Sequence, residues 1–176
     1  LEGPGVHHAS GEHALSGFLW NSDVIYEKYV YWLCRRAASQ RGKRVNKDEL
    51  TFGQIIKGEG NKLKTTPDVV FHDSLGVPVA VTDAKYKHLG LRPKSADTYQ
   101  ILTAGHVLGC QRVSLIYPAA IAREPIIWLV PSALGGQDIE LTALPINLMG
   151  LVQPKGQKYL IDSIGAWLDG ELFATD

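Results

Sequence analysis

The chain has 176 residues, 45% of them apolar and 20% charged, which is enough to bury the core of one globular domain. It shows no apolar run long enough to cross a membrane and no secretory signal, so we expect a cytoplasmic protein. Cys34 and Cys110 lack the spacing of metal ligands, which favours packing residues in a reduced compartment. We interpret residues 1–16, rich in Gly and His, as a linker or an appended segment, and residues 17–176 as one domain.

The formal net charge is zero, but the charges are unevenly distributed along the chain. Residues 1–27 carry four acids and no Lys or Arg, and residues 124–176 carry seven acids and two bases. Between them, residues 28–123 carry sixteen bases and seven acids, a net charge of +9. Because Lys and Arg supply most of the affinity for a phosphate backbone, we expect nucleic acid to contact this middle section.

Residues 22–38 are expected to form the first helix, with Asn21 or Ser22 as its N-cap. Its predicted apolar face consists of Ile25, Tyr29, Trp32 and Leu33. Glu27 lies off this stripe and is free to face a cleft, although an ordinary surface acid would show the same pattern.

A run of basic residues begins at Arg35, near the end of this helix, includes Lys47, and leads into a Gly-rich loop at residues 58–61. The residues that we expect to contact DNA are Arg35, Arg36, Arg41, Lys43, Arg44, Lys62, Lys64 and Lys87. A solvated helix end followed by a flexible loop is the alternative interpretation of the same charges.

Two short apolar strands come next, at residues 69–71 and 78–82, joined by residues 72–76 with hairpin-turn chemistry. Asp68 precedes the first strand and Asp83 follows the second. Antiparallel pairing through this turn would bring both acids to the same end of the hairpin.

Asp83 and Lys85 are two residues apart, so on a strand both side chains point to one face and Ala84 points to the other. Two carboxylates can hold a hard divalent cation, and a nearby ammonium can orient a water molecule or neutralise a phosphate. The alternative is a turn acid followed by a surface ion pair at a strand end.

Residues 95–108 are predicted to form a helix with Ser95 as N-cap and Gly109 as C-terminal cap. Asp97 and Gln100 are three residues apart and therefore share one face of this helix. A buried strand at residues 112–118 follows and ends at a proline.

The remaining chain is predicted to contain a buried strand at residues 126–130, an exposed edge strand at residues 139–142 and a closing amphipathic helix at residues 158–172. The expected fold is therefore α/β, with a mixed central sheet of about four or five strands flanked by helices, to which the tail adds one or two strands.

Four segments together resemble the PD-(D/E)xK nuclease superfamily and, more closely, McrC, the nuclease subunit of McrBC-type modification-dependent restriction systems. They are Thr66–Val70, Thr82–Lys87, Asp97–Gln100 and Val113–Pro118, and their order and spacing also agree with that family. The first helix, at Ile25–Val30, is similar as well.

The resemblance implies a restriction-endonuclease-like core and a site that binds Mg²⁺, with Mn²⁺ as a substitute. It implies that Asp68, Asp83 and the carbonyl of Ala84 are metal ligands and that Lys85 is the catalytic lysine. It also implies that Glu27 contacts a second metal or a water molecule, and that Gln100 lies at the edge of the site. The chain departs from the related glutamine-x-x-x-tyrosine pattern because Ala104 occupies the tyrosine position.

The resemblance further implies a prokaryotic endonuclease that cuts double-stranded DNA together with a GTP-hydrolysing AAA+ motor subunit, which recognises the modified cytosine. It implies an upstream domain that docks on the motor. Cutting both strands would favour a dimer during cleavage.

Three alternatives remain open at this point. The first is another nuclease of the same fold, such as a RecB-like or junction-resolving enzyme. The second is a catalytically silent DNA-binding or scaffold module, and the third is an unrelated α/β enzyme in which these charges are coincidental.

Overall fold

The structure is a computed structural model that describes residues 21–54, 56–132 and 136–173. The interpretation of residues 1–16 as a linker or an appended segment therefore falls outside the described residues. In chain order the elements are α1 (Ser22–Ser39), β1 (Arg44–Asn46), β2 (Leu50–Gly53), β3 (Leu63–Thr65), β4 (Val69–His72), β5 (Pro78–Ala84), α2 (Ser95–Leu108), β6 (Arg112–Ala119), β7 (Ile126–Val130), β8 (Ile139–Asn147), η1 (Leu148–Val152), α3 (Gly156–Asp169) and η2 (Glu171–Phe173).

A six-stranded mixed sheet forms the centre of the fold, in the order β1-β4-β5-β6-β8-β7. β4 pairs antiparallel with both β1 and β5, whereas β5, β6 and β8 run parallel to one another, and β7 closes the far edge antiparallel to β8. The parallel pairs need crossover connections, and α2 supplies the one between β5 and β6. The predicted α/β class with a mixed central sheet is confirmed.

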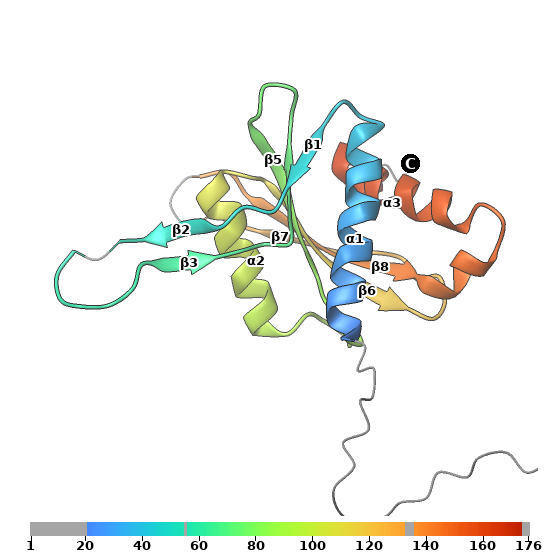
Figure 1. The fold of residues 1–176 in the computed structure, drawn as a ribbon, viewed down its shortest axis with the longest axis horizontal. Helices are drawn as coiled ribbons and strands as arrows, with labels where there is room; N and C mark the ends of the chain where they lie inside the picture. The colour runs from blue at the N-terminus through green and yellow to red at the C-terminus, as the bar shows by residue number, and fades with distance from the viewer. Residues whose placement is uncertain (1–20, 55, 133–135, 174–176) are drawn as a thin grey trace, which may run out of the picture.

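Helices cover both faces of this sheet (Figure 1). On one face α1 and α3 pack around the fully buried Trp167, whose ring meets Phe71 of β4 edge-on with 5.8 Å between the ring centroids. On the other face α2 packs over Val81, Leu115 and Tyr117. From Ala80 to Ala84, successive residues of β5 alternate between these two cores, which is why Asp83 lies on the α2 side and Ala84 on the α1 side.

The buried face of α1 differs from the prediction. The residues that it buries are Tyr26, Val30, Leu33, Cys34, Ala37 and Ala38. Ile25 is instead 46% exposed, and Trp32 lies under the guanidinium of Arg36, 5.4 Å from the ring centroid. The small residues face inward because α1 packs against both the sheet and α3, which requires a close approach.

The positions of the last two strands, β7 and β8, are the reverse of those that the sequence predicts. β8 is central rather than an edge, and β7 is the edge, with Leu129 70% exposed. Glu140 is tolerated in a central strand because it lies in register with Arg112 of β6, 3.8 Å from its guanidinium. Alternation of polar and apolar residues therefore gave the wrong position for β8.

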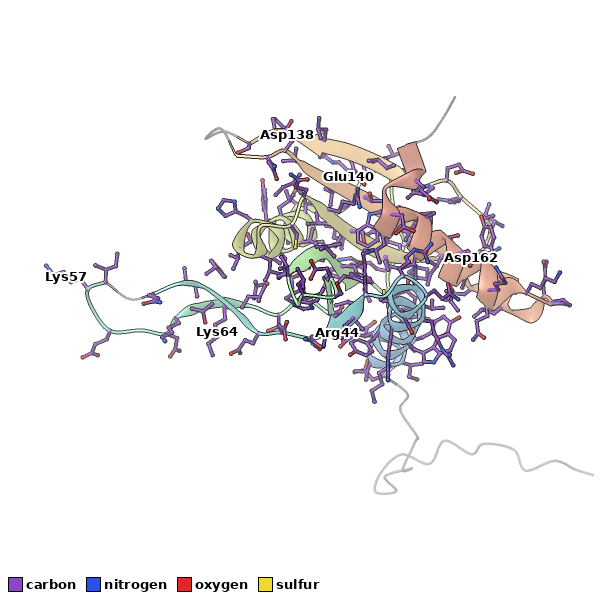
Figure 2. The ribbon with its side chains drawn as sticks, turned by 90° about the horizontal axis from the view of Figure 1, so that it is seen from above. Arg44, Lys57, Lys64, Asp138, Glu140 and Asp162 are labelled. Atoms are coloured by element: carbon purple, nitrogen blue, oxygen red, sulfur yellow. The ribbon has the colours of Figure 1, made fainter. Side chains whose placement is uncertain are left out.

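A two-stranded arm, β2 and β3, extends away from the sheet and was not predicted (Figure 1). The Gly-rich loop at residues 58–61 connects its strands, and Lys57 lies at its far end (Figure 2). Lys57 and Lys64 lie along this arm, whereas Asp138 and Glu140 lie on the body of the molecule, away from it (Figure 2).

Candidate active site

The β4–β5 hairpin brings Asp68 and Asp83 together, as the sequence predicts. Val69 lies opposite Thr82, so the next pair outward is Asp68 and Asp83. The backbone N–H of Asp68 donates to Asp83 Oδ1 at 3.2 Å, and the backbone N–H of Ala84 donates to Asp68 Oδ2 at 2.8 Å. Each carboxylate is thus held by a backbone amide at the end of the other strand, which fixes the geometry of the pair.

Both carboxylates are buried, with 9% of Asp68 and 3% of Asp83 exposed. Burial raises the pKa of Asp68 above its usual value, and the neighbouring Asp83 carboxylate raises it further, whereas the hydrogen bond from Ala84 opposes the shift. Two adjacent buried anions repel each other, so the pair requires cations close by.

Lys85 supplies one of these cations from the end of β5. Its ammonium contacts Asp83 Oδ2, lies 3.9 Å from Asp97 Oδ1, and donates to Gln100 Oε1 at 3.4 Å. The structure therefore brings Lys85 and Gln100 to the acid pair. Ala104 lies on the buried face of α2, is fully buried, and presents no polar group at the position of the missing tyrosine.

Asp97 belongs to this site although the sequence analysis gave it no role. It lies in the first turn of α2, is buried, and forms an ion pair with Lys87 at 2.5 Å. Its position four residues before the apolar Ile101 could have indicated its burial, because both residues lie on the same face of the helix.

The predicted N-cap of α2 was wrong by one residue, because Lys94 occupies that position without a side-chain hydrogen bond and Ser95 is already helical.

Lys47, which follows the edge strand β1, reaches the site from the other side. Its ammonium contacts Glu27 Oε1 and lies 3.4 Å from Asp68 Oδ1. The pKa of Lys47 is raised, first by the hydrogen bond to Glu27 and then by the Asp68 charge, against the opposing effect of burial. Glu27 is thus joined to the acid pair through a lysine that the sequence analysis named only as a member of the basic run.

The acid pair suits a hard divalent cation. Asp83 Oδ2 is buried without a hydrogen-bond donor and has only the Lys85 ammonium beside it, so it has unused capacity for a metal. No three His, Cys, Asp or Glu side chains within the described part of the chain are grouped closely enough to hold a metal by themselves. Two carboxylates and the Ala84 carbonyl would therefore hold Mg²⁺ together with water or a phosphate oxygen.

Five of the eight residues predicted to contact DNA lie in three places. Lys87 lies at the site, and Lys62 and Lys64 belong to the β2–β3 arm, where Lys64 pairs with Glu49 at 2.7 Å. Arg35 and Arg36 are exposed on α1.

The other three predicted DNA contacts lie away from the acid pair. Arg41 donates to Asp169 at 2.5 Å, and Lys43 lies 3.9 Å from the same carboxylate. Arg44 pairs in register with His72, at the end of β4 opposite to Asp68. This part of the basic run therefore does not lead to the acid pair.

The two cysteines have no part in the site. Both are buried and free, and burial raises the pKa of the Cys110 thiol to about 11 and that of Cys34 further still. Thiols with raised pKa values are poor nucleophiles and metal ligands, which agrees with the predicted packing role.

A mixed sheet covered by helices on both faces, with acids and a lysine at the ends of two neighbouring strands, places the molecule in the restriction-endonuclease-like class of α/β folds. The family model of the McrBC 5-methylcytosine restriction system component matches residues 1–118. The chain therefore belongs to the McrBC family of restriction system components.

A solved complex from Thermococcus gammatolerans, described as a half-complex from a tetradecameric assembly of McrB AAA+ hexamers with bound McrC, contains a chain of similar fold. The TM-score is 0.61 at 13% sequence identity, over 81% of this chain and 32% of that chain. The present chain thus spans about a third of the length of that neighbour. No curated protein sequence matches the chain.

None of the helices in the part of the chain that the structure describes combines the length and the hydropathy that crossing a membrane requires.

Proposed function

We propose that this chain is the nuclease domain of a modification-dependent restriction system and hydrolyses phosphodiester bonds in double-stranded DNA with Mg²⁺. The observation that carries the proposal is the reciprocal backbone support of Asp68 and Asp83, with Lys85 against Asp83. A structural ion pair needs one acid and one base. Two buried acids fixed side by side are instead typical of a divalent-cation site.

When bound, the cation would polarise the scissile phosphate and make an attacking water molecule more acidic. The chain's own residues would provide the rest of the chemistry. Asp68 and Asp83 would hold the cation, and the Ala84 and Asp68 amides fix the positions of their carboxylates. The Lys85 ammonium lies within reach of the same space, where it can hold the attacking water and offset the negative charge of the transition state.

Asp97 and Gln100 complete the arrangement around Lys85. Asp97 lies near both Lys85 and Lys87, and Gln100 accepts a hydrogen bond from Lys85. They limit the positions that the flexible lysine side chain can adopt, which lowers the entropic cost of placing its charge at the phosphate. Lys87 would then contact a flanking phosphate.

Membership of the McrBC family favours an action on DNA that carries modified cytosine. The Thermococcus neighbour belongs to an assembly with AAA+ hexamers, so we propose that this chain also works with an AAA+ motor that supplies GTP hydrolysis and recognition of the modified base. Cutting both strands would require two copies of the domain. Family membership also favours this function over a RecB-like or junction-resolving nuclease.

Two measurements test the proposal. Mn²⁺ titration should show binding to the wild-type chain that Asp83→Ala abolishes. With Mg²⁺ and an AAA+ motor subunit of the McrB type, methylated plasmid DNA should be cleaved and unmethylated plasmid DNA should not, and the cleavage should require Asp83. A folded wild-type chain that bound no divalent cation, alone or with DNA, would favour a silent DNA-binding module.

A further inference from the structure

Lys47 occupies the space between two acids of the site. Its ammonium contacts Glu27 of α1 and lies 3.4 Å from Asp68 at the start of β4. These acids come from elements that are 41 residues apart in the sequence, and the lysine is the group that joins them. The four carboxylate oxygens of Asp68 and Asp83 have one partner each, and the partner of Asp68 Oδ1 is Lys47.

A second metal ion in a nuclease site lies about 4 Å from the first and shares a carboxylate with it. In this chain Asp68 is the acid that could be shared, and Glu27 is the further acid on that side. The Lys47 ammonium already lies between them. A divalent cation in that space would have to displace it, because two cations in contact repel strongly in a partly buried site.

The net charge of the site also favours one divalent cation over two. Four carboxylates are matched by three ammonium groups, so the site as built has one excess negative charge. One divalent cation and one phosphate would leave it neutral. A second divalent cation would leave two excess positive charges, in a space where Asp68 and Asp83 are buried.

We propose that Lys47 is a tethered cation that takes the place of a second metal ion, so that the site holds one divalent cation. Lys47 is then a positioning residue: it holds Glu27 and neutralises the outer oxygen of Asp68. The inference rests on the proposed function, because it requires the Asp68–Asp83 pair to bind a metal.

The test is the number of Mn²⁺ ions that the chain binds, measured by calorimetry and by electron paramagnetic resonance. The wild type should bind one ion, with the signal of an isolated Mn²⁺. Lys47→Met, which keeps an unbranched side chain of nearly the same length but removes its charge, should bind two. The second ion should give a spin-coupled signal, because the ions would lie about 4 Å apart.

Two further variants make the result specific. Glu27→Gln added to Lys47→Met should return the number of ions to one, because Glu27 would be a ligand of the second. Lys64→Met is the matched control: Lys64 also pairs with a glutamate, and its side chain is 47% exposed against 45% for Lys47, but it lies outside the site. It should bind one ion.

The possible outcomes distinguish a failure of the Lys47 inference alone from a failure of the proposed nuclease function as well. Two ions on the wild type, or one ion on a folded Lys47→Met variant, would overturn the role of Lys47 and leave the metal site intact. If Lys47→Met does not fold, two ions on Lys47→Gln support the inference and one ion overturns it. No binding that depends on Asp83 would overturn both proposals.

Discussion

At one end of the central strands three lysines surround four carboxylates, and at the other end two arginines bind the end of α3. Lys47, Lys85 and Lys87 all contact acids of the site. Arg41 donates to Asp169 of α3 at 2.5 Å, and Arg112 donates to the carbonyl of Leu168 at 2.7 Å. All five cations come from the basic section at residues 28–123, yet the two groups have different surroundings.

The difference follows from the chemistry of the two side chains. A guanidinium is planar and presents its donors in a fixed fork, so it suits the last carbonyl and the acid at a helix end, where the helix dipole also favours a cation. An ammonium on a flexible stem is a compact charge that can move towards a phosphate, a water molecule or a metal. The arginines here stabilise the fold, and the lysines are available for chemistry.

The largest expected effect is a loss of DNA cleavage when a lysine of the site is removed. Lys85→Ala should reduce DNA cleavage about 10²- to 10³-fold, because it removes a charge that would stabilise the transition state. The folded state and Mn²⁺ binding should be retained, since the acid pair keeps its backbone hydrogen bonds. Single-turnover cleavage and Mn²⁺ calorimetry measure the two effects separately. Cleavage equal to that of the wild type would remove Lys85 from the mechanism.

On the arginine side, Arg41→Ala should lower the free energy of unfolding by about 1.5–3 kcal/mol, the range for a hydrogen bond to a charged group. Arg41 also packs against Gly165, where a Cβ atom would lie 2.1 Å from its guanidinium carbon. Urea denaturation measures the loss, and Mn²⁺ binding should not change.

Gly165→Ala provides a second test of the same contact. Its methyl group should displace Arg41 and lower stability in the same direction, so the double variant should lose less than the two single losses combined. Additive losses would show that Arg41 and Gly165 do not act through one contact.

A smaller effect is expected at the edge of the site. Gln100→Ala should reduce cleavage about twofold to tenfold, because it removes one exposed hydrogen bond to Lys85 while the contact with Asp83 remains. Initial cleavage rates at saturating Mg²⁺ measure it. A loss as large as that of Lys85→Ala would mean that Gln100 touches the substrate itself.

The smallest effect concerns the arm. Lys62→Ala with Lys64→Ala should lower the dependence of log affinity on log salt by about 2, roughly 0.9 for each phosphate that the protein no longer neutralises. Arg41→Ala is the control and should leave the slope unchanged, because its guanidinium is bound to Asp169. Fluorescence anisotropy of a labelled duplex at several salt concentrations gives the slopes.

Part of the site could be predicted because it is local in sequence. Asp68 and Asp83 flank a hairpin whose turn is closed by Asp73, which accepts hydrogen bonds from the amides of Leu75 and Val77. Such a turn fixes the register, and the register fixes which residues meet at the open end. Lys85 follows from strand periodicity alone.

Lys47 and Asp97 could not be assigned in the same way. Lys47 reaches Glu27 and Asp68 across gaps of 20 and 21 residues, and nothing in its neighbouring sequence distinguishes it from Lys43, which pairs with Asp169 instead. Asp97 is buried on a helix that meets Lys85 and Lys87 only when α2 packs on the sheet.

The sequence by itself determined the α/β class, the hairpin, the paired acids with their lysine, and the order of the elements from β4 to β6. These depend on hydrophobic periodicity and turn chemistry, which act over a few residues. Tertiary structure alone decided which face of α1 is buried, that β8 rather than β7 is central, and which basic residues reach the acids. Those outcomes depend on packing between distant elements, where a small residue or a paired charge outweighs the local pattern.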